Sequence, residues 1–81
     1  MFYVKVHRKR GEVLVAVCDR EVHNERFTDG DLGFFVDPSF YGDEGTDEEG
    51  LKELFEEATM INMAGEGCVD LAIRLGYVDP E

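Results

Sequence analysis

An alternation of apolar and polar side chains near the start of the chain constrains the fold more than any other feature. Residues 2–7 alternate in this way, and a second, mostly apolar run covers residues 13–18. Two such runs on either side of a short break are typical of a β-hairpin. The break is residues 9–11, and its last residue, Gly11, suits a three-residue loop that ends with positive φ. The sequence therefore predicts two antiparallel strands.

The length of this loop decides which residues face each other across the hairpin. The predicted pairs on one face are Arg8 with Glu12, Val6 with Leu14, Val4 with Ala16, and Phe2 with Cys18. The predicted pairs on the other face are His7 with Val13, Lys5 with Val15, and Tyr3 with Val17. A slip of one residue would exchange the two faces, so the apolar pattern selects this register. The three valines of the second face then lack cover, which favours a homodimer through an exposed valine face of the sheet.

The middle of the chain predicts one more strand. Asp19 is expected to cap a short helical turn over residues 20–23, because its carboxylate can accept the free N–H groups of that turn. Residues 32–36 are mostly apolar and predict a third strand, which ends before Pro38 because proline has no N–H for a ladder. The aromatic turn at residues 40–42 is expected to fold back onto the sheet.

The C-terminal half predicts two helices. Thr46 with Glu49 three residues later forms a capping box, and the apolar spacing that follows predicts a helix that ends near Gly65. A shorter helix is expected over residues 68–75. The fold class is therefore α+β, with residues 1–81 as a single domain. Its small antiparallel sheet, made of the N-terminal hairpin and the third strand, packs against the two C-terminal helices.

Charge is divided unevenly along the chain, which has a net charge of −11. The first 28 residues carry six basic and four acidic side chains, a net charge of +2, and the rest carry two basic and fifteen acidic side chains, a net charge of −13. A basic end on an acidic body can attract a polyanion locally while the whole molecule repels it. We therefore expect a non-enzymatic binding module that docks RNA or a ribonucleoprotein of the translation apparatus. The candidate nucleic-acid-binding residues are Lys5, Arg8, Lys9, Arg10, Arg20 and Arg26.

The basic run at residues 8–10 has two interpretations. Its three cations can contact phosphates, and Tyr3 supplies a neighbouring ring for base stacking. The alternative is a solvated turn that keeps the protein soluble and prevents an edge strand from pairing. A homo-oligomer that uses the valine face is the competing prediction for the function as a whole.

Other kinds of site are disfavoured by residue spacing. The two histidines and two cysteines do not form the closely spaced ligand pairs of structural zinc sites. The acidic segments 29–31 and 43–49 do not match the EF-hand loop. Cys18 and His23 would be a nucleophile and its base, but a cysteine with apolar neighbours on a strand is more often a core residue. We expect no catalytic residue, no metal and no cofactor.

The sequence also predicts where the protein resides. Its longest apolar run, residues 13–18, is too short for the core of a signal peptide or for a membrane span. The two cysteines, Cys18 and Cys68, do not make a disulfide framework and are expected to be reduced. These features favour a cytoplasmic protein without a membrane partner.

Several short motifs carry a family resemblance. They are the segment from Val13 to Asp19, Phe27 with Gly30 and Leu32, the turn from Phe40 to Gly42, and Ala58 with Asn62 and Gly65. On these residues the chain resembles the archaeal family of unknown function DUF424, from Tyr3 to Val78. The resemblance implies a small cytosolic protein without assigned chemistry, for which RNA binding has been suggested as a prediction. Relatives continue with a further apolar, strand-like segment, so we expect the sheet to have one strand fewer than theirs.

Overall fold

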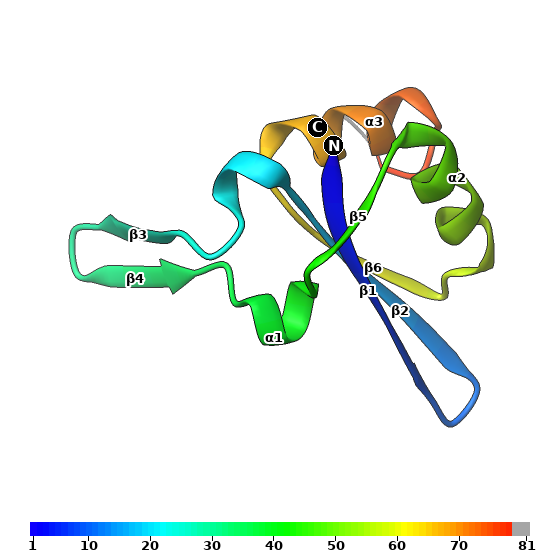
Figure 1. Cartoon of the computed structure of the whole chain (residues 1–81), viewed down its shortest axis with the longest axis horizontal. Helices are drawn as coiled ribbons and strands as arrows, with labels where there is room; N and C mark the ends of the chain where they lie inside the picture. The colour runs from blue at the N-terminus through cyan, green and yellow to red at the C-terminus, as the bar shows by residue number, and fades with distance from the viewer. Residues whose placement is uncertain (79–81) are drawn as a thin grey trace.

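A four-stranded mixed sheet forms the centre of the molecule (Figure 1). The computed structural model describes residues 1–78, with the backbone alone for Asp29. The strands of the sheet are β1 (Phe2–Lys9), β2 (Glu12–Asp19), β5 (Glu44–Thr46) and β6 (Met60–Ala64). Their order is β5-β1-β2-β6; β1 is antiparallel to both of its neighbours, and β2 is parallel to β6. The sheet thus places strands from the first and second halves of the chain side by side.

Helices cover the two faces of this sheet unequally. On one face lie α2 (Glu48–Glu57) and α3 (Glu66–Arg74), and the other carries the 3₁₀ turn η1 (Arg20–Val22) and the short α1 (Pro38–Tyr41). The core under α2 and α3 consists of Phe2, Val4, Val15, Val17, Leu51, Phe55, Cys68, Leu71 and Ala72. A smaller core under α1 consists of Ala16, Cys18, Val36, Tyr41 and Ala64. This arrangement confirms the predicted α+β class.

The hairpin between β1 and β2 forms as predicted, but its register differs by one residue. Lys9 lies opposite Glu12, and Val6 lies opposite Val15. Arg10 and Gly11 form a two-residue turn in which both residues have positive φ, 53° and 82°. Turns of this kind match the right-handed twist of the strands they connect. The predicted three-residue loop, and every residue pair derived from it, is therefore wrong.

The corrected register puts the valines inside the molecule. Val15 and Val17 share a face with Val4, and α2 and α3 cover that face so closely that both are fully buried. Full burial of a valine side chain contributes roughly 1.5–3 kcal/mol. The prediction of an exposed valine face is therefore wrong, because that face is the main core and is not available to a second copy.

The third predicted strand exists but lies outside the main sheet. It is β4 (Leu32–Phe35), which pairs with β3 (Arg26–Asp29) in a separate two-stranded ribbon. Figure 1 shows this ribbon, which we call the arm, projecting from the body. At its base, Asn24 N donates to Val36 O and Val36 N donates to Glu25 O, each at 2.9 Å.

The long helix predicted from Thr46 to Gly65 is divided in two by the structure. Its cap is Asp47, whose carboxylate accepts the Gly50 N–H at 2.9 Å, and the helix ends at Glu57. The rest of the segment forms β6, because it extends the sheet alongside β2. The capping role of Thr46 and the helical assignment of residues 60–64 are both wrong.

Asp19 caps a helix, but not the turn that follows it in sequence. No side chain caps η1; instead, the two carboxylate oxygens of Asp19 accept the N–H groups of Gly67 and Cys68, each at 2.7 Å. These groups belong to the first turn of α3, whose N-terminus favours a negative charge. Asp19 is only 5% exposed, so this carboxylate ties the end of β2 to α3.

Candidate nucleic-acid interface

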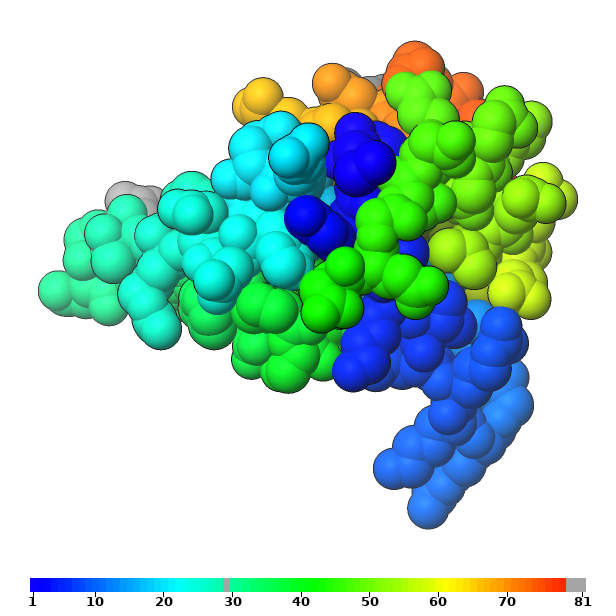
Figure 2. All heavy atoms as spheres, viewed as in Figure 1, coloured from blue at the N-terminus to red at the C-terminus, as the bar shows by residue number. Residues whose placement is uncertain are grey.

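The turn end of the β1–β2 hairpin projects from the body (Figure 2). β5 pairs with β1 at residues 2–4, and within residues 1–78 no strand lies beside the remainder of that edge of β1. The basic run at residues 8–10 lies on this projecting part and is exposed. The sequence-based prediction of a protruding basic hairpin therefore agrees with the structure.

The three cations of this run differ in their partners. Arg8 points to the helix face and forms a 2.9 Å ion pair with Glu57, in which both side chains are at least half exposed. Exposed pairs of this kind contribute about 0–1 kcal/mol, so Arg8 can exchange its partner at little cost. Lys9 and Arg10 form no ion pair with a carboxylate of residues 1–28 or 30–78.

Alternation places Lys5 and His7 on the same face of β1 as Lys9. The Lys5 amine donates to the Ser39 carbonyl at 2.9 Å. His7 Nε2 donates to the Phe40 carbonyl at 2.9 Å, and the two rings stack with their centroids 5.0 Å apart. This face therefore presents cations beside a pair of stacked rings.

Two of the six residues predicted to bind nucleic acid lie elsewhere, and so does Tyr3, the ring expected to support base stacking. Arg20 follows the far end of β2, and Tyr3 lies near the same end, with its ring 4.1 Å from that of His23. Arg26 is on the arm, with its guanidinium 4.6 Å from the centre of the Phe35 ring. We call the four candidates that remain together the tip cluster; they are Lys5, Arg8, Lys9 and Arg10.

Sequence analysis did not include Phe40 among the candidate site residues, although its ring stacks on that of His7 beside the tip cluster. Its position depends on α1 packing against β1, a contact between segments more than 30 residues apart. The sequence signal was the aromatic pair at residues 40 and 41, and the expectation that this turn folds back onto the sheet is confirmed.

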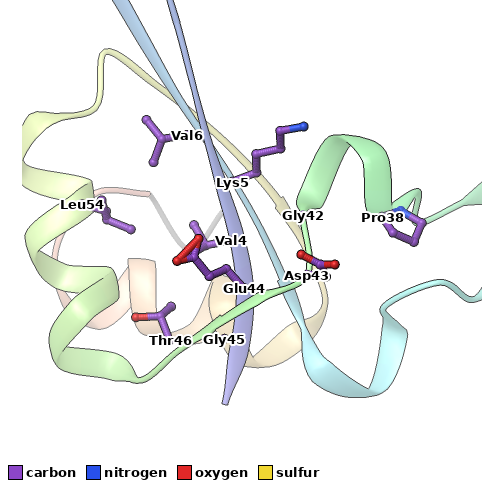
Figure 3. Close-up of a pocket in the computed structure, with 10 residues that line it drawn as sticks. All are labelled: Val4, Lys5, Val6, Pro38, Gly42, Asp43, Glu44, Gly45, Thr46 and Leu54. Carbon is purple, nitrogen blue, oxygen red and sulfur yellow. The ribbon is translucent and has the colours of Figure 1, made fainter.

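A groove lies beside β1, between α2 and the segment that joins α1 to β5 (Figure 3). Its volume is about 640 Å³. Val4, Val6 and Leu54 form an apolar part of its wall, while Lys5 and the carboxylates of residues 43 and 44 contribute charge. Among the described residues, Thr46 contributes a hydroxyl group to this lining.

The two cysteines are buried, and each of the two histidines forms a hydrogen bond with a backbone carbonyl. Cys18 and Cys68 are free and fully buried. Burial raises the pKa of Cys18 to about 11 and the pKa of Cys68 to about 12, so both thiols are neutral at ordinary pH. His23 Nε2 donates to the Gly42 carbonyl at 2.6 Å. In the part of the chain that the structure describes, no three His, Cys, Asp or Glu side chains are grouped to hold a metal ion.

None of the helices within residues 1–78 combines the length and the apolarity that crossing a bilayer requires.

Comparison with known proteins identifies relatives without an assigned activity. Residues 7–81 match the family model described as "Protein of unknown function (DUF424)", which confirms the resemblance found in the sequence. No curated protein matches the chain. A solved structure of an uncharacterized conserved protein from the archaeon Methanopyrus kandleri is similar, with a TM-score of 0.79 and 17% identity. The similarity covers 98% of this chain and 76% of that one, and at this identity it shows the fold alone.

Proposed function

On the premise that this chain belongs to the DUF424 family of proteins of unknown function, we propose that it is a non-enzymatic module that docks RNA, free or within a ribonucleoprotein. The tip cluster is the contact surface. The observation that carries this proposal is that Lys9 and Arg10 are exposed next to the turn of the projecting hairpin (Figure 2) and form no ion pair with a carboxylate of residues 1–28 or 30–78. The cytoplasmic location expected from the sequence is part of the same proposal and is supported by two free, buried thiols.

Electrostatics limits how strong this docking is. With two to four phosphate contacts, the logarithm of affinity for single-stranded RNA should fall with the logarithm of salt at a slope of about −1.4 to −2.8. The net charge of −11 opposes the approach of any polyanion. The cluster therefore acts as a local contact within a larger assembly, and Arg8 joins it by leaving Glu57.

Charge reversal at the tip tests the proposal directly. We expect the double substitution Lys9→Glu with Arg10→Glu to remove two phosphate contacts and to make the salt slope shallower by about 1.4. The measurement is fluorescence anisotropy with a labelled 20-nucleotide oligouridine, titrated at several potassium chloride concentrations between about 50 and 200 mM. A hairpin RNA of equal length shows whether single strands are preferred.

A control with the same change in net charge is available on the chain. Arg20→Glu with Arg26→Glu alters two exposed cations that lie away from the tip, so RNA binding should change much less. Equal losses in the two double variants would mean that binding reports only net charge. Either that result or the absence of RNA binding by the parent protein at low salt would refute the proposal.

A further inference from the structure

One face of the arm carries a bare apolar patch. Phe27 and Phe34 are paired across the ribbon, with their ring centroids 6.1 Å apart, and Leu32 lies two residues before Phe34 on the same face. These side chains are 42%, 53% and 73% exposed, respectively. Together they expose on the order of 300 Å² of mostly apolar surface, within the range of the largest, often functional, patch on an ordinary monomer. We call these three residues the arm patch.

The opposite face of the arm differs. Its aromatic residue, Phe35, is only half-buried by the protein but is covered in part by the Arg26 guanidinium. Among the described side chains, none stacks on the arm patch in this way, although water is an unfavourable neighbour for aromatic rings. The arm lies outside the main sheet, so the fold of the body does not account for the exposure of these side chains.

The charge around the arm selects the kind of partner. Residues 25–37 contain four carboxylates and one basic side chain, Arg26, and the whole chain has a net charge of −11. Two copies would therefore repel each other. The patch is also smaller than the roughly 800 Å² that each partner buries in an ordinary stable interface, so a contact made by the patch alone is weak with any partner. A second copy of this chain does not fit these observations.

We propose that the arm patch docks a partner protein whose surface combines apolar side chains with positive charge. The two phenylalanines act as anchors in the partner's apolar sites, as aromatic side chains do at the centres of interfaces. The acidic surroundings attract the partner's basic residues and exclude acidic surfaces. This contact is separate from the tip cluster and goes beyond RNA docking, since it lies on another element and selects the opposite charge.

Synthetic peptides test both requirements. The first probe is a ten-residue peptide of alternating lysine and leucine; a lysine–serine peptide keeps the charge, and a glutamate–leucine peptide keeps the apolar side chains. We expect the lysine–leucine peptide to bind on the order of tenfold more tightly than either control, because each control lacks one of the two requirements. The measurement is isothermal titration calorimetry at low and moderate salt.

Variants assign the binding to the arm. Leu32→Ser with Phe34→Ser should weaken binding of the lysine–leucine peptide on the order of tenfold and leave oligouridine binding unchanged. Met60→Ser is the matched control, because Met60 is 50% exposed but lies on β6, where binding should change less than about twofold. Circular dichroism spectra that match the parent protein verify that the variants fold.

Three results would overturn the proposal. One is binding of the glutamate–leucine or lysine–serine peptide as tightly as the lysine–leucine peptide. Another is an equal loss of binding in the Met60→Ser variant. The third is a dimer in sedimentation velocity that the Leu32→Ser and Phe34→Ser double variant abolishes, since the occupant of the patch would then be a second copy.

Discussion

Substituting Gly65 with alanine should be among the most destabilising single changes in this protein. Gly65 has φ of 113° and ψ of 152°, a conformation that essentially only glycine adopts, so alanine costs about 1–3 kcal/mol in backbone strain. The new Cβ would also lie 2.5 Å from Cγ of Asp19, where an atom cannot fit. The carboxylate would have to move, although the N–H groups of Gly67 and Cys68 hold it at 2.7 Å.

The expected loss follows from these two costs. A hydrogen bond to a charged group contributes about 1.5–3 kcal/mol, so losing one of them together with the backbone strain gives a total of about 2.5–6 kcal/mol. A domain of this size has a free energy of unfolding of about 4–12 kcal/mol. Urea denaturation followed by far-UV circular dichroism should therefore show a much lower midpoint with an unchanged slope.

Gly76 provides a control that separates the two costs. It has φ of 86° but, among the described residues, nothing within 4 Å of the position of a new Cβ, so Gly76→Ala measures backbone strain alone, about 1–2 kcal/mol. When Asp19 is already replaced by glycine, the further loss of stability from Gly65→Ala should decrease towards the loss measured for Gly76→Ala, because the new Cβ no longer clashes with the Asp19 side chain. If Gly65→Ala costs no more than Gly76→Ala in the parent protein, the inference that Asp19 locks this loop is wrong.

Two further predictions concern buried groups. Neither Cys18 nor Cys68 should react with a thiol reagent in the folded protein at about pH 8, because burial raises their pKa values to about 11 and about 12; rapid labelling without unfolding would contradict this. Since the ordinary thiol pKa is 9.0, the unfolded chain releases protons above that pH while the folded chain keeps them. The free energy of unfolding should thus decrease from pH 9 towards 11, and less steeply when both residues are alanine. Tyr41→Phe removes the 2.8 Å hydrogen bond from the tyrosine hydroxyl to Asn62 Oδ1 and should cost about 1 kcal/mol, which lowers Tm by about 4–8 °C; an unchanged Tm would show that this bond between α1 and β6 contributes nothing.

The strands of the hairpin could be predicted from the sequence, but their register could not. The alternation before and after the turn defines the strands without fixing the loop length. A glycine at the end of the loop fits a loop of two residues as well as a loop of three residues. The two-residue turn requires Arg10 at φ of 53°, which is uncommon outside glycine, asparagine and aspartate. A difference of one residue in the length of the loop thus determines which face of β2 lies in the main core.

The elements that sequence analysis missed depend on distant partners. Residues 60–64 continue the apolar spacing of α2, and no glycine or proline separates them from it. They form a strand because β2 offers an edge more than 40 residues away in the sequence. β5 is short and begins with an acidic residue, Glu44, so no local preference reveals it. The cap that Asp19 provides to α3 spans 48 residues or more, and no local pattern encodes it.

The part of the candidate site that consists of adjacent basic residues could be predicted from the sequence. Arg8, Lys9 and Arg10 are adjacent in sequence and therefore remain adjacent in space. Arg20 and Arg26 were predicted to bind nucleic acid only because they are near this run in sequence, but the fold places Arg20 in η1 and Arg26 in β3.

The two hydrogen bonds between Asn24, Glu25 and Val36 close the base of the arm, so its outer part can change in length without disturbing the sheet. Each added pair of residues, one in β3 and one in β4, moves the end of the arm about 3.3 Å outwards. A single added pair next to the base also turns the outer side chains to the opposite side, whereas two pairs restore their direction. The reach of the phenylalanines and the direction in which they point can thus be adjusted separately by insertions at one location.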